Sequence, residues 1–302
     1  MKNNNLDIDI ESLDSQEEFL KLYDSSKYPK ACNTVDILLF TVADKQTEID
    51  IKSLPEKELK ILLIKRKNQP YKDSWAIPGG FVDLNEGLIS SAYRELKEET
   101  NVDNVYLEQL YTWGDDVNRD ARDVVFSTSY IALVPEEGLK PRAGDDAKEV
   151  AWFTIKKEKT YENDELIHWE LNLINEEKDI RIAYSIVDEK VKNGRISVIK
   201  TKEIKPFVNM KHTLAFDHSY MISYGIDRIR NKAEYSPILF NLVPEKFTLT
   251  SLQKVYETLL NKSYTPNNFR QKVGKYVEKL NEKETGKGFR PADLYKYNGF
   301  TD

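Results

Sequence analysis

The chain has 302 residues, of which 40% are hydrophobic and 32% charged, and its formal net charge is −6. Its longest apolar run, residues 36–43, is far shorter than the roughly 20 residues that span a bilayer. Its first residues lack the features of a signal peptide, its single cysteine excludes an internal disulfide, and three histidines are too few for a zinc finger. We expect a cytoplasmic protein without membrane contacts, built as two domains or as one domain with large insertions, and its acidity argues weakly against nucleic-acid binding.

The first half of the chain predicts an N-terminal arm followed by an α/β domain. Residues 1–30 are acidic and predict an arm with one short helix at 16–23. Apolar, β-branched segments at 35–42 and 59–65 predict two strands joined by a polar loop or hairpin, and a helix is expected at 86–100. Three more strands are expected at 105–114, 124–134 and 149–155.

Two further features separate this domain from the C-terminal part. Residues 156–205 contain three alternating segments between charged turns, which predict a β-rich insertion. Residues 213–232 predict a connecting helix, and the position of His218 on its apolar face favours a buried packing role over catalysis. We therefore place the first domain at 31–235 and the second at 236–302.

The second domain has the element order of a winged helix. Residues 250–253 fit a capping box at the start of one amphipathic helix, and Thr265 with Pro266 begins a second helix. A charged hairpin is expected to follow. Residues 244–302 contain 11 Lys and Arg against 7 Asp and Glu, so this part is basic within an acidic chain. The apolar stripe expected on the second helix consists of Phe269, Val273, Val277 and Leu280.

A group of carboxylates on the expected helix 86–100 is the most informative feature. Glu95, Glu98 and Glu99 stand at positions i, i+3 and i+4, so they share one side of the helix and are expected to face a cleft. Like charges at this spacing repel, and a hard divalent cation such as Mg²⁺ or Mn²⁺ offsets that repulsion. Arg94 is placed to hold one glutamate. The alternative is a solvated acidic helix face, which three glutamates alone favour.

The full spacing around these glutamates resembles the Nudix box. Its matching positions are Gly80, then Glu86 after five intervening residues, Arg94-Glu95 after seven further intervening residues, and then Leu96, Glu98-Glu99 and Val102. Asn101 stands where the Nudix box has glycine, and asparagine is the next most tolerant residue in the left-handed conformation of a helix end. A match of this length favours the metal site over the solvated helix face.

The Nudix resemblance implies an α/β/α sandwich around a mixed β-sheet and metal-dependent hydrolysis of a diphosphate. By the same resemblance, Glu95 and Glu99 are principal ligands of Mg²⁺ or Mn²⁺, Glu98 is a further ligand or its support, and the Gly80 carbonyl contacts a metal. Arg94 orients the glutamates and completes the catalytic set. Candidates for the general base, each of which also fits a loop cap or a solvated carboxylate, are Asp115, Asp116, Asp145, Asp146 and Glu149.

Three segments resemble the ADP-ribose-binding branch of the Nudix family, which implies a nucleoside diphosphate derivative such as ADP-ribose as the ligand. Residues 119–122 (Arg-Asp-Ala-Arg) resemble its Arg-Asp-Pro-Arg segment, and residues 143–147 and 214–218 also recur in that branch. Arginines clamp phosphates bidentately, although for each of them a surface pair with an acid is an equal alternative. The expected substrate-binding residues are Arg66, Arg119, Arg122 and Asp146.

Residues 213–302 resemble the C-terminal half of Nudix-related transcriptional regulators. In a winged helix the second helix enters the major groove of double-stranded DNA, and its side chains contact bases and phosphates. The alternative is a basic solvated surface. Recognition of two operator half-sites predicts a homodimer. The expected DNA contacts are Lys262, Asn267, Asn268, Arg270, Lys272, Lys287 and Arg290.

The motifs of the two domains leave two hypotheses for the function of the chain. The favoured one, because the Arg-Glu and Glu-Glu pairs are intact, is a Nudix hydrolase that cleaves the diphosphate of ADP-ribose or a related nucleoside diphosphate derivative, coupled to DNA binding. The alternative is a transcriptional regulator whose Nudix domain senses such a metabolite without turnover. One chain is able to do both.

Overall fold

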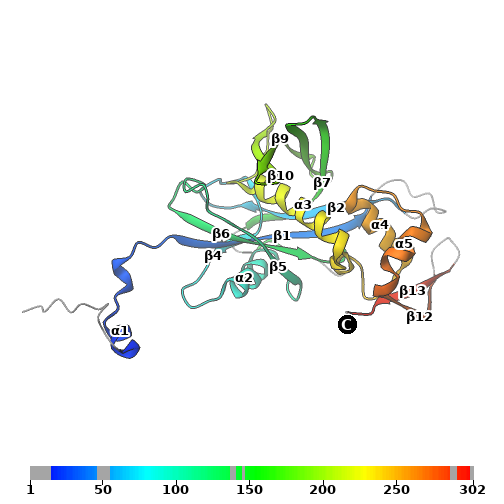
Figure 1. Cartoon of the computed structure of the whole chain (residues 1–302), viewed down its shortest axis with the longest axis horizontal. Helices are drawn as coiled ribbons and strands as arrows, with labels where there is room; N and C mark the ends of the chain where they lie inside the picture. Colours follow the sequence, from blue (N-terminus) through cyan, green and yellow to red (C-terminus); the bar gives the residue numbers. More distant parts are fainter. Residues whose placement is uncertain (1–14, 46–54, 137–140, 145–146, 286–290, 300–302) are drawn as a thin grey trace, which may run out of the picture.

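A mixed β-sheet runs through the larger part of the molecule (Figure 1). The computed structural model describes residues 15–45, 55–136, 141–144, 147–285 and 291–299. The strands of this sheet are β1 (Cys32–Asp44), β2 (Lys57–Arg66), β3 (Trp75–Ala76), β4 (Gly79–Phe81), β5 (Tyr106–Trp113), β6 (Val125–Leu133), β7 (Ala147–Glu162), β8 (Leu166–Asn175), β9 (Ile180–Asn193) and β10 (Ile196–Pro206). Their order is β10-β9-β8-β7-β2-β1-β6-β5, with β3 on β2 and β4 on β1. The central pair β1 and β6 is parallel, whereas β1 and β2 are antiparallel.

Helices cover both faces of this sheet. The helices are α1 (Gln16–Leu22), which lies apart from the sheet in Figure 1, α2 (Leu88–Thr100) and α3 (His218–Tyr235). Along β1 the side chains alternate between the faces: Val35, Ile37 and Leu39 pack against α2, whereas Leu38 and Phe40 pack in the core with α3. This arrangement confirms the predicted α/β/α sandwich with a mixed sheet.

The predicted β-rich insertion at 156–205 is a continuation of the central sheet. β7 runs unbroken through position 156, so the expected boundary there is wrong, and β8, β9 and β10 follow as an antiparallel meander. The meander also forms hydrogen bonds with α3 and with the segment just before it. The Tyr184 hydroxyl accepts a hydrogen bond from the Leu214 amide at 2.9 Å, and the Ile204 amide donates to the Tyr220 hydroxyl at 3.1 Å.

The helix α3 begins later than the predicted position 213. Residues 213–215 pair with Trp75 instead, because the Trp75 amide donates to the Thr213 carbonyl at 3.3 Å and the Ala215 amide donates to the Trp75 carbonyl at 2.8 Å, and a turn at 216–217 then leads into the helix. At its other end, α3 stops before Ser236, which takes extended angles ahead of a proline. The hydrogen bonds that displace the start of α3 come from a strand far away in the sequence.

The C-terminal part is a winged helix, as predicted. It contains β11 (Phe247–Thr248), α4 (Leu249–Leu260), α5 (Pro266–Val273), β12 (Val277–Glu284) and β13 (Ala292–Tyr297), with the sheet order β11-β13-β12. The expected N-cap at Thr250 is wrong, because the Thr248 side chain accepts the Ser251 amide at 3.1 Å and starts α4 two residues earlier.

The second helix of this unit begins as predicted and ends early. Thr265 is the N-cap of α5 and Pro266 occupies its first turn. The helix ends at Gly274, so Val277 and Leu280 lie in β12 and not on the apolar stripe where we expected them. The stripe predicted from helical periodicity therefore extends only to the residue before that glycine.

The winged helix packs directly on the α/β part of the molecule. The Thr258 hydroxyl donates to the Lys57 carbonyl at 3.3 Å, and Arg230 Nε of α3 donates to the Leu259 carbonyl of α4 at 2.9 Å. One cluster of buried apolar side chains extends from β1 to α5. Among the residues described, no helix combines the length and apolar character that a bilayer span requires. The domain division at 235/236 stays a prediction.

Candidate functional site

The C-terminal end of α2 is fixed by a left-handed residue and a neighbouring glycine. Asn101 has φ 57° and ψ 26°, the conformation predicted for an asparagine at the glycine position of the Nudix box. The Gly144 amide donates to the Glu99 carbonyl at 3.1 Å, and a methyl group at Gly144 would lie 1.7 Å from the Glu98 carbonyl oxygen. The glycine of the segment 143–147 therefore serves to close the end of the carboxylate helix.

Arg94 links three of the glutamates and the strand β4. Its guanidinium donates to Glu86 at 2.9 and 3.0 Å, to Glu95 at 2.7 Å, to Glu98 at 3.2 Å and to the Phe81 carbonyl at 3.1 Å. These hydrogen bonds, above all those to Glu86, raise the pKa of Arg94. The geometry is that of an orienting residue, and the catalytic role of Arg94 stays a prediction.

Two carboxylates of α2 lie against the glycines of β4. Glu99 is only 8% exposed, and its Oε2 accepts the Gly79 amide at 2.7 Å. Burial raises the pKa of Glu99 to about 8 in spite of that hydrogen bond, and burial also raises the pKa of Glu95. A methyl group at Gly80 would lie 2.3 Å from a Glu95 oxygen, so this carboxylate needs a glycine beneath it. The oxygen donors gathered here have the chemistry that Mg²⁺ and Mn²⁺ prefer.

Glu98 does not share this position. Its side chain is 62% exposed and pairs with Arg94, and it does not line the cavity described below, so the expectation that all three carboxylates face one cleft is wrong for Glu98. The reason is how α2 packs on the sheet: the side chains of Glu95 and Glu99, one turn apart, lie against β4, whereas position 98 on the same helix is turned toward solvent. In the described part of the chain no three His, Cys, Asp or Glu residues are arranged to hold a metal ion. The candidate ligands that remain together are Glu95, Glu99 and the Gly80 carbonyl.

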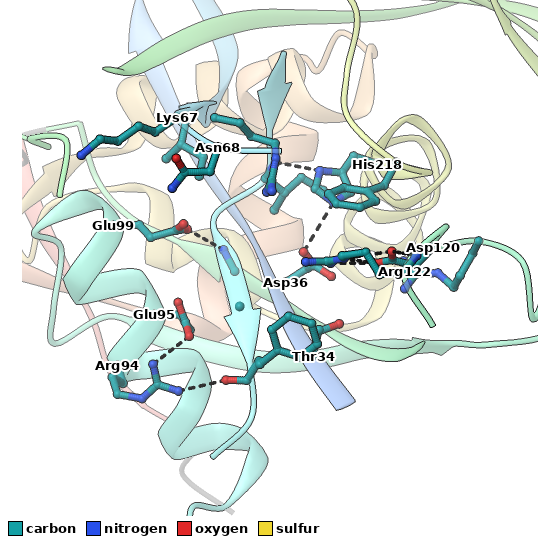
Figure 2. Close-up of a pocket in the computed structure, with 18 of the residues that line it drawn as sticks. Thr34, Asp36, Lys67, Asn68, Arg94, Glu95, Glu99, Asp120, Arg122 and His218 are labelled. Carbon is teal, nitrogen blue, oxygen red and sulfur yellow. Dashed lines mark hydrogen bonds and ion pairs between the residues drawn. The ribbon is translucent and has the colours of Figure 1, made fainter. Parts of the chain in front are cut away.

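A cavity of about 390 Å³ opens beside these carboxylates (Figure 2). It lies between α2, β4, the end of β2, the loop before β6 and the start of α3. Acids and bases enter from different elements, with Glu95 and Glu99 on α2 and Arg122 across the cavity in Figure 2. The charged residues that line the cavity are Asp36, Asp83, Glu95, Glu99 and Asp120, with Arg66, Lys67, Arg94, Arg119 and Arg122.

Two of the predicted arginines gather around one phenyl ring. The guanidinium carbons of Arg66 and Arg122 lie 5.1 and 5.5 Å from the centre of the Phe216 ring, and Arg122 also lies 5.0 Å from that of Phe81. Burial, with the nearby charge of Arg122, lowers the pKa of Arg66. Asp120 pairs with Arg122 at 2.7 Å and raises the pKa of that guanidinium. This wall concentrates positive charge next to flat aromatic surfaces.

Arg119 also lines the cavity, but its guanidinium already forms two hydrogen bonds with the carboxylate of an acidic residue. Its Nε and Nη2 donate to the two oxygens of Asp217 at 2.9 and 2.7 Å, and its side chain is only 7% exposed. Both Arg119 and Arg122 therefore form the acid pairs that the sequence left as the equal alternative to phosphate binding. Their position on the cavity wall is compatible with both roles.

The sequence did not single out Asp36 and Phe216. Asp36, an acid among the buried apolar residues of β1, accepts a hydrogen bond from Ser127, and its Oδ1 lies 3.5 Å from His218 Nε2. His218 Nδ1 accepts the Ile77 amide at 2.9 Å, so the ring is held as the Nε2–H tautomer, and burial lowers its pKa. The ring is buried as predicted, but it also lines the cavity, and its packing role stays a prediction. Phe216 has φ +48°, a conformation that no periodicity argument predicts.

The described candidates for the general base lie away from the cavity lining. Asp116 caps its own loop by accepting the Asn118 amide at 2.9 Å, and Glu149 pairs with Lys178. These contacts match the alternative roles that we weighed for them. Two candidates, one of them also an expected substrate contact, lie outside the described residues: Asp145 and Asp146.

The helix α5 has a buried side and an exposed polar side. Phe269 and Val273 are buried in the core of the winged helix, whereas Asn267, Asn268 and Arg270 are exposed. The three exposed side chains can therefore reach a groove of DNA without unpacking the domain.

Two of the lysines predicted to contact DNA form ion pairs with α3. Lys272 Nζ lies 3.3 Å from a carboxylate oxygen of Glu234, and Lys262 pairs with the other oxygen of that carboxylate. The ion pair with Lys262 lowers the pKa of Glu234. The other two predicted contacts, Lys287 and Arg290, lie outside the described residues.

The sequence matches two domain families. Residues 44–171 match the NUDIX domain, and residues 239–297 match the NrtR DNA-binding winged helix domain. Over 287 residues the chain is 29% identical to the ADPR responsive transcriptional repressor NtrR of Acinetobacter baylyi, which covers 94% of this chain and 88% of that protein.

Solved structures and a second relative agree with these matches. NrtR of Shewanella oneidensis, complexed with a 27mer DNA, has a TM-score of 0.55 and 28% identity over 88% of this chain and 93% of its own. The ADP-ribose pyrophosphatase of Methanocaldococcus jannaschii is 41% identical over 107 residues, 35% of this chain and 62% of that protein. A MutT/nudix family protein from Enterococcus faecalis has a TM-score of 0.68 and 31% identity over 96% of both chains. This chain therefore belongs to the MutT/Nudix family and carries the NrtR type of DNA-binding winged helix domain.

Proposed function

We propose that this chain is a transcriptional regulator that binds an operator through its winged helix and senses ADP-ribose in its Nudix domain. The observation that carries the proposal is the exposed polar side of α5 in a winged helix that packs on the domain with the cavity. A hydrolase does not need such a unit. The similarity to an ADPR responsive repressor over 94% of the chain supports the same function. Regulation therefore replaces hydrolysis as the preferred of our two hypotheses.

The cavity supports a nucleoside diphosphate derivative as the ligand. Its volume of about 390 Å³ lies within the range of small-molecule sites. Arg66 and Arg122 present planar guanidiniums that match phosphate oxygens bidentately, and Phe216 and Phe81 offer flat surfaces for a base or a sugar. Asp120 holds Arg122 in place, so less side-chain freedom is lost when a ligand binds.

The winged helix supports recognition of double-stranded DNA. Arg270, Asn267 and Asn268 are of the types that contact base edges, whereas Lys262 and Lys272 suit phosphates. Lys287 and Arg290 are expected on phosphates as well. An operator with two half-sites requires two winged helices, and we expect a homodimer, which light scattering can test.

A second function, hydrolysis of the ligand, is supported by the intact carboxylate pair Glu95 and Glu99 and by the Arg94 network. An Mg²⁺ or Mn²⁺ ion held by these carboxylates and the Gly80 carbonyl would supply Lewis-acid chemistry and an activated water. The chain's own residues orient the carboxylates and keep Glu99 buried. The similarity to an ADP-ribose pyrophosphatase over 107 residues supports this activity.

The regulator is tested by selecting genomic DNA fragments on the purified chain at low salt. We expect an enriched operator, bound with an affinity that changes when ADP-ribose is added, as measured by fluorescence anisotropy. If no fragment is enriched, or if ADP-ribose leaves the operator affinity unchanged, the proposed regulation is wrong.

The hydrolase is tested separately, with AMP release from ADP-ribose in the presence of Mg²⁺. Turnover that Glu99→Gln abolishes supports hydrolysis. A thermal shift by ADP-ribose without AMP release, in the wild-type chain, shows binding without turnover and rules the hydrolase out for this ligand.

A further inference from the structure

The residue just before α3 uses its side chain in an unusual way. Asp217 is the N-cap of this helix, where aspartate ordinarily accepts a hydrogen bond from a backbone amide of the first turn. Here its carboxylate makes no such bond to the described helix and binds Arg119 through both oxygens instead. The start of α3 therefore lacks the side-chain cap that Asp217 could form, because the Asp217 carboxylate binds Arg119, 98 positions earlier in the chain.

Arg119 is at the same time part of the cavity wall. A diphosphate in the cavity competes with Asp217 for this guanidinium, since both are bidentate oxygen acceptors. If Arg119 turns to the ligand, the Asp217 carboxylate is released at the N-terminus of α3, where the helix dipole favours a negative charge. The His218 and Tyr220 amides already donate to the Ala215 and Asp217 carbonyls, so the amide left for this carboxylate to accept is that of Ser219. The preceding residue, Phe216, has φ +48° and packs near Arg66 and Arg122, so the connection to α3 responds to the same cavity.

The far end of α3 reaches the DNA-binding unit. The helix has 18 residues, which is about 27 Å at 1.5 Å per residue. In its last turns Arg230 donates to the Leu259 carbonyl, and Glu234 pairs with Lys262 and Lys272, two lysines expected on DNA phosphates. A shift of α3 therefore changes both the position of the winged helix and the competition between Glu234 and phosphate for these lysines.

We propose that the Arg119–Asp217 ion pair is a latch that the ligand opens, and that α3 transmits the opening to Lys262 and Lys272 through Glu234. In the ligand-free state Asp217 binds Arg119, and in the liganded state it caps α3. These are two discrete arrangements of one element, which is what coupling between two sites requires. This inference rests on the proposed regulation by a nucleoside diphosphate derivative and names its route.

The decisive variant is Asp217→Asn, because asparagine is as good an N-cap as aspartate but gives Arg119 no charged partner. Operator affinity and ADP-ribose affinity are measured separately on the full chain, by fluorescence anisotropy and by calorimetry. In the wild type we expect ADP-ribose to change the operator Kd by roughly 5- to 150-fold, the usual range of coupling. In Asp217→Asn this ratio falls toward 1, the ligand-free operator Kd takes the wild-type liganded value, and ADP-ribose binds more tightly because no ion pair has to be broken.

Glu234→Gln tests the other end of the helix, far from the cavity and beside the lysines expected on the operator. We expect the ADP-ribose Kd of this variant to be the same with and without operator. The control is Glu278→Gln, which also removes one negative charge, here from the exposed strand β12, where Glu278 pairs with Lys296. This variant should show the wild-type effect of ADP-ribose on the operator Kd.

The outcomes separate this inference from the function on which it rests. If the wild type binds neither operator nor ADP-ribose, the proposed function fails. If the wild type shows coupling and Asp217→Asn retains the full ratio, or binds ADP-ribose more weakly as a merely damaged site would, the latch is wrong. If Glu278→Gln abolishes coupling as Glu234→Gln does, the route through Glu234 is wrong.

Discussion

The buried carboxyl of Glu99 leads to a sharp prediction about stability and pH. Burial raises its pKa from 4.5 to about 8, so in the metal-free chain it stays protonated at pH 7 while the same group in the unfolded chain is ionised. A group whose pKa is higher in the folded chain than in the unfolded chain contributes its full stabilisation at pH values below the pKa that it has in the unfolded chain. This contribution is lost as the pH rises toward the pKa that it has in the folded chain. The free energy of unfolding should therefore fall between pH 5 and pH 8.

The size of the effect follows from the shift. At about 1.36 kcal/mol per pKa unit, the wild type should lose on the order of 3–4 kcal/mol over this interval relative to Glu99→Gln, whose amide resembles the protonated acid and does not titrate. The assay is urea unfolding in EDTA at pH 5, 6, 7 and 8. The matched control is Glu98→Gln, one position away but 62% exposed, which should keep the wild-type slope.

A divalent cation should reverse the effect, because it binds the ionised carboxylate. Adding Mg²⁺ at pH 7 should release close to one proton per ion bound, and its affinity should rise toward pH 8. Calorimetry in buffers of different ionisation enthalpy counts that proton. Parallel pH profiles for the wild type and Glu99→Gln would refute the reasoning about the buried acid, and tight Mg²⁺ binding by Glu99→Gln would refute its role as a ligand.

Three further predictions address the ligand, the operator and the fold. Arg122→Ala should raise the Kd for ADP-ribose by roughly 10- to 100-fold in calorimetry, since hydrogen bonds to charged groups contribute about 1.5–3 kcal/mol. An unchanged Kd would mean that Arg122 does not contact the ligand. Arg270→Ala should cost about 1–3 kcal/mol of operator binding and leave ADP-ribose binding intact, and equal losses for all DNA sequences would mean that it contacts phosphates and not bases. Asn101→Ala should lower the free energy of unfolding by about 1–2 kcal/mol, because φ is 57° at this position and alanine is strained there, whereas Asn101→Gly should not lower it. Equal free energies of unfolding for the two variants would contradict the left-handed helix end.

Much of the carboxylate helix α2 could be predicted from the sequence because its signals are local. The spacing of Glu95 and Glu99 places them one turn apart in any α-helix, and the position of Asn101 identifies its end. The N-cap at Thr265 and the first turn at Pro266 were predictable for the same reason, since capping depends on the residues next to the helix. Helical periodicity alone did not show that Glu98 turns away from the cavity, which depends on where the sheet lies.

The winged helix illustrates the limit of periodicity within one element. The apolar spacing from Phe269 continues to Val277 and Leu280, and the sequence predicts a longer helix there. In the structure the helix ends at Gly274, and the following residues pair with β13. Apolar residues at helical spacing also fit a strand, so the choice between the two depends on whether a partner strand is available.

The amino-acid sequence by itself determined the family, the element order and the carboxylate helix, because each depends on residues close together in the chain. Only the tertiary structure decided which groups meet in the cavity. Asp36 and His218 come from β1 and α3, and Arg119 meets Asp217 across 98 positions. Such pairs require the sheet to form and α3 to cross it, and the propensities of single segments contain no information about that packing.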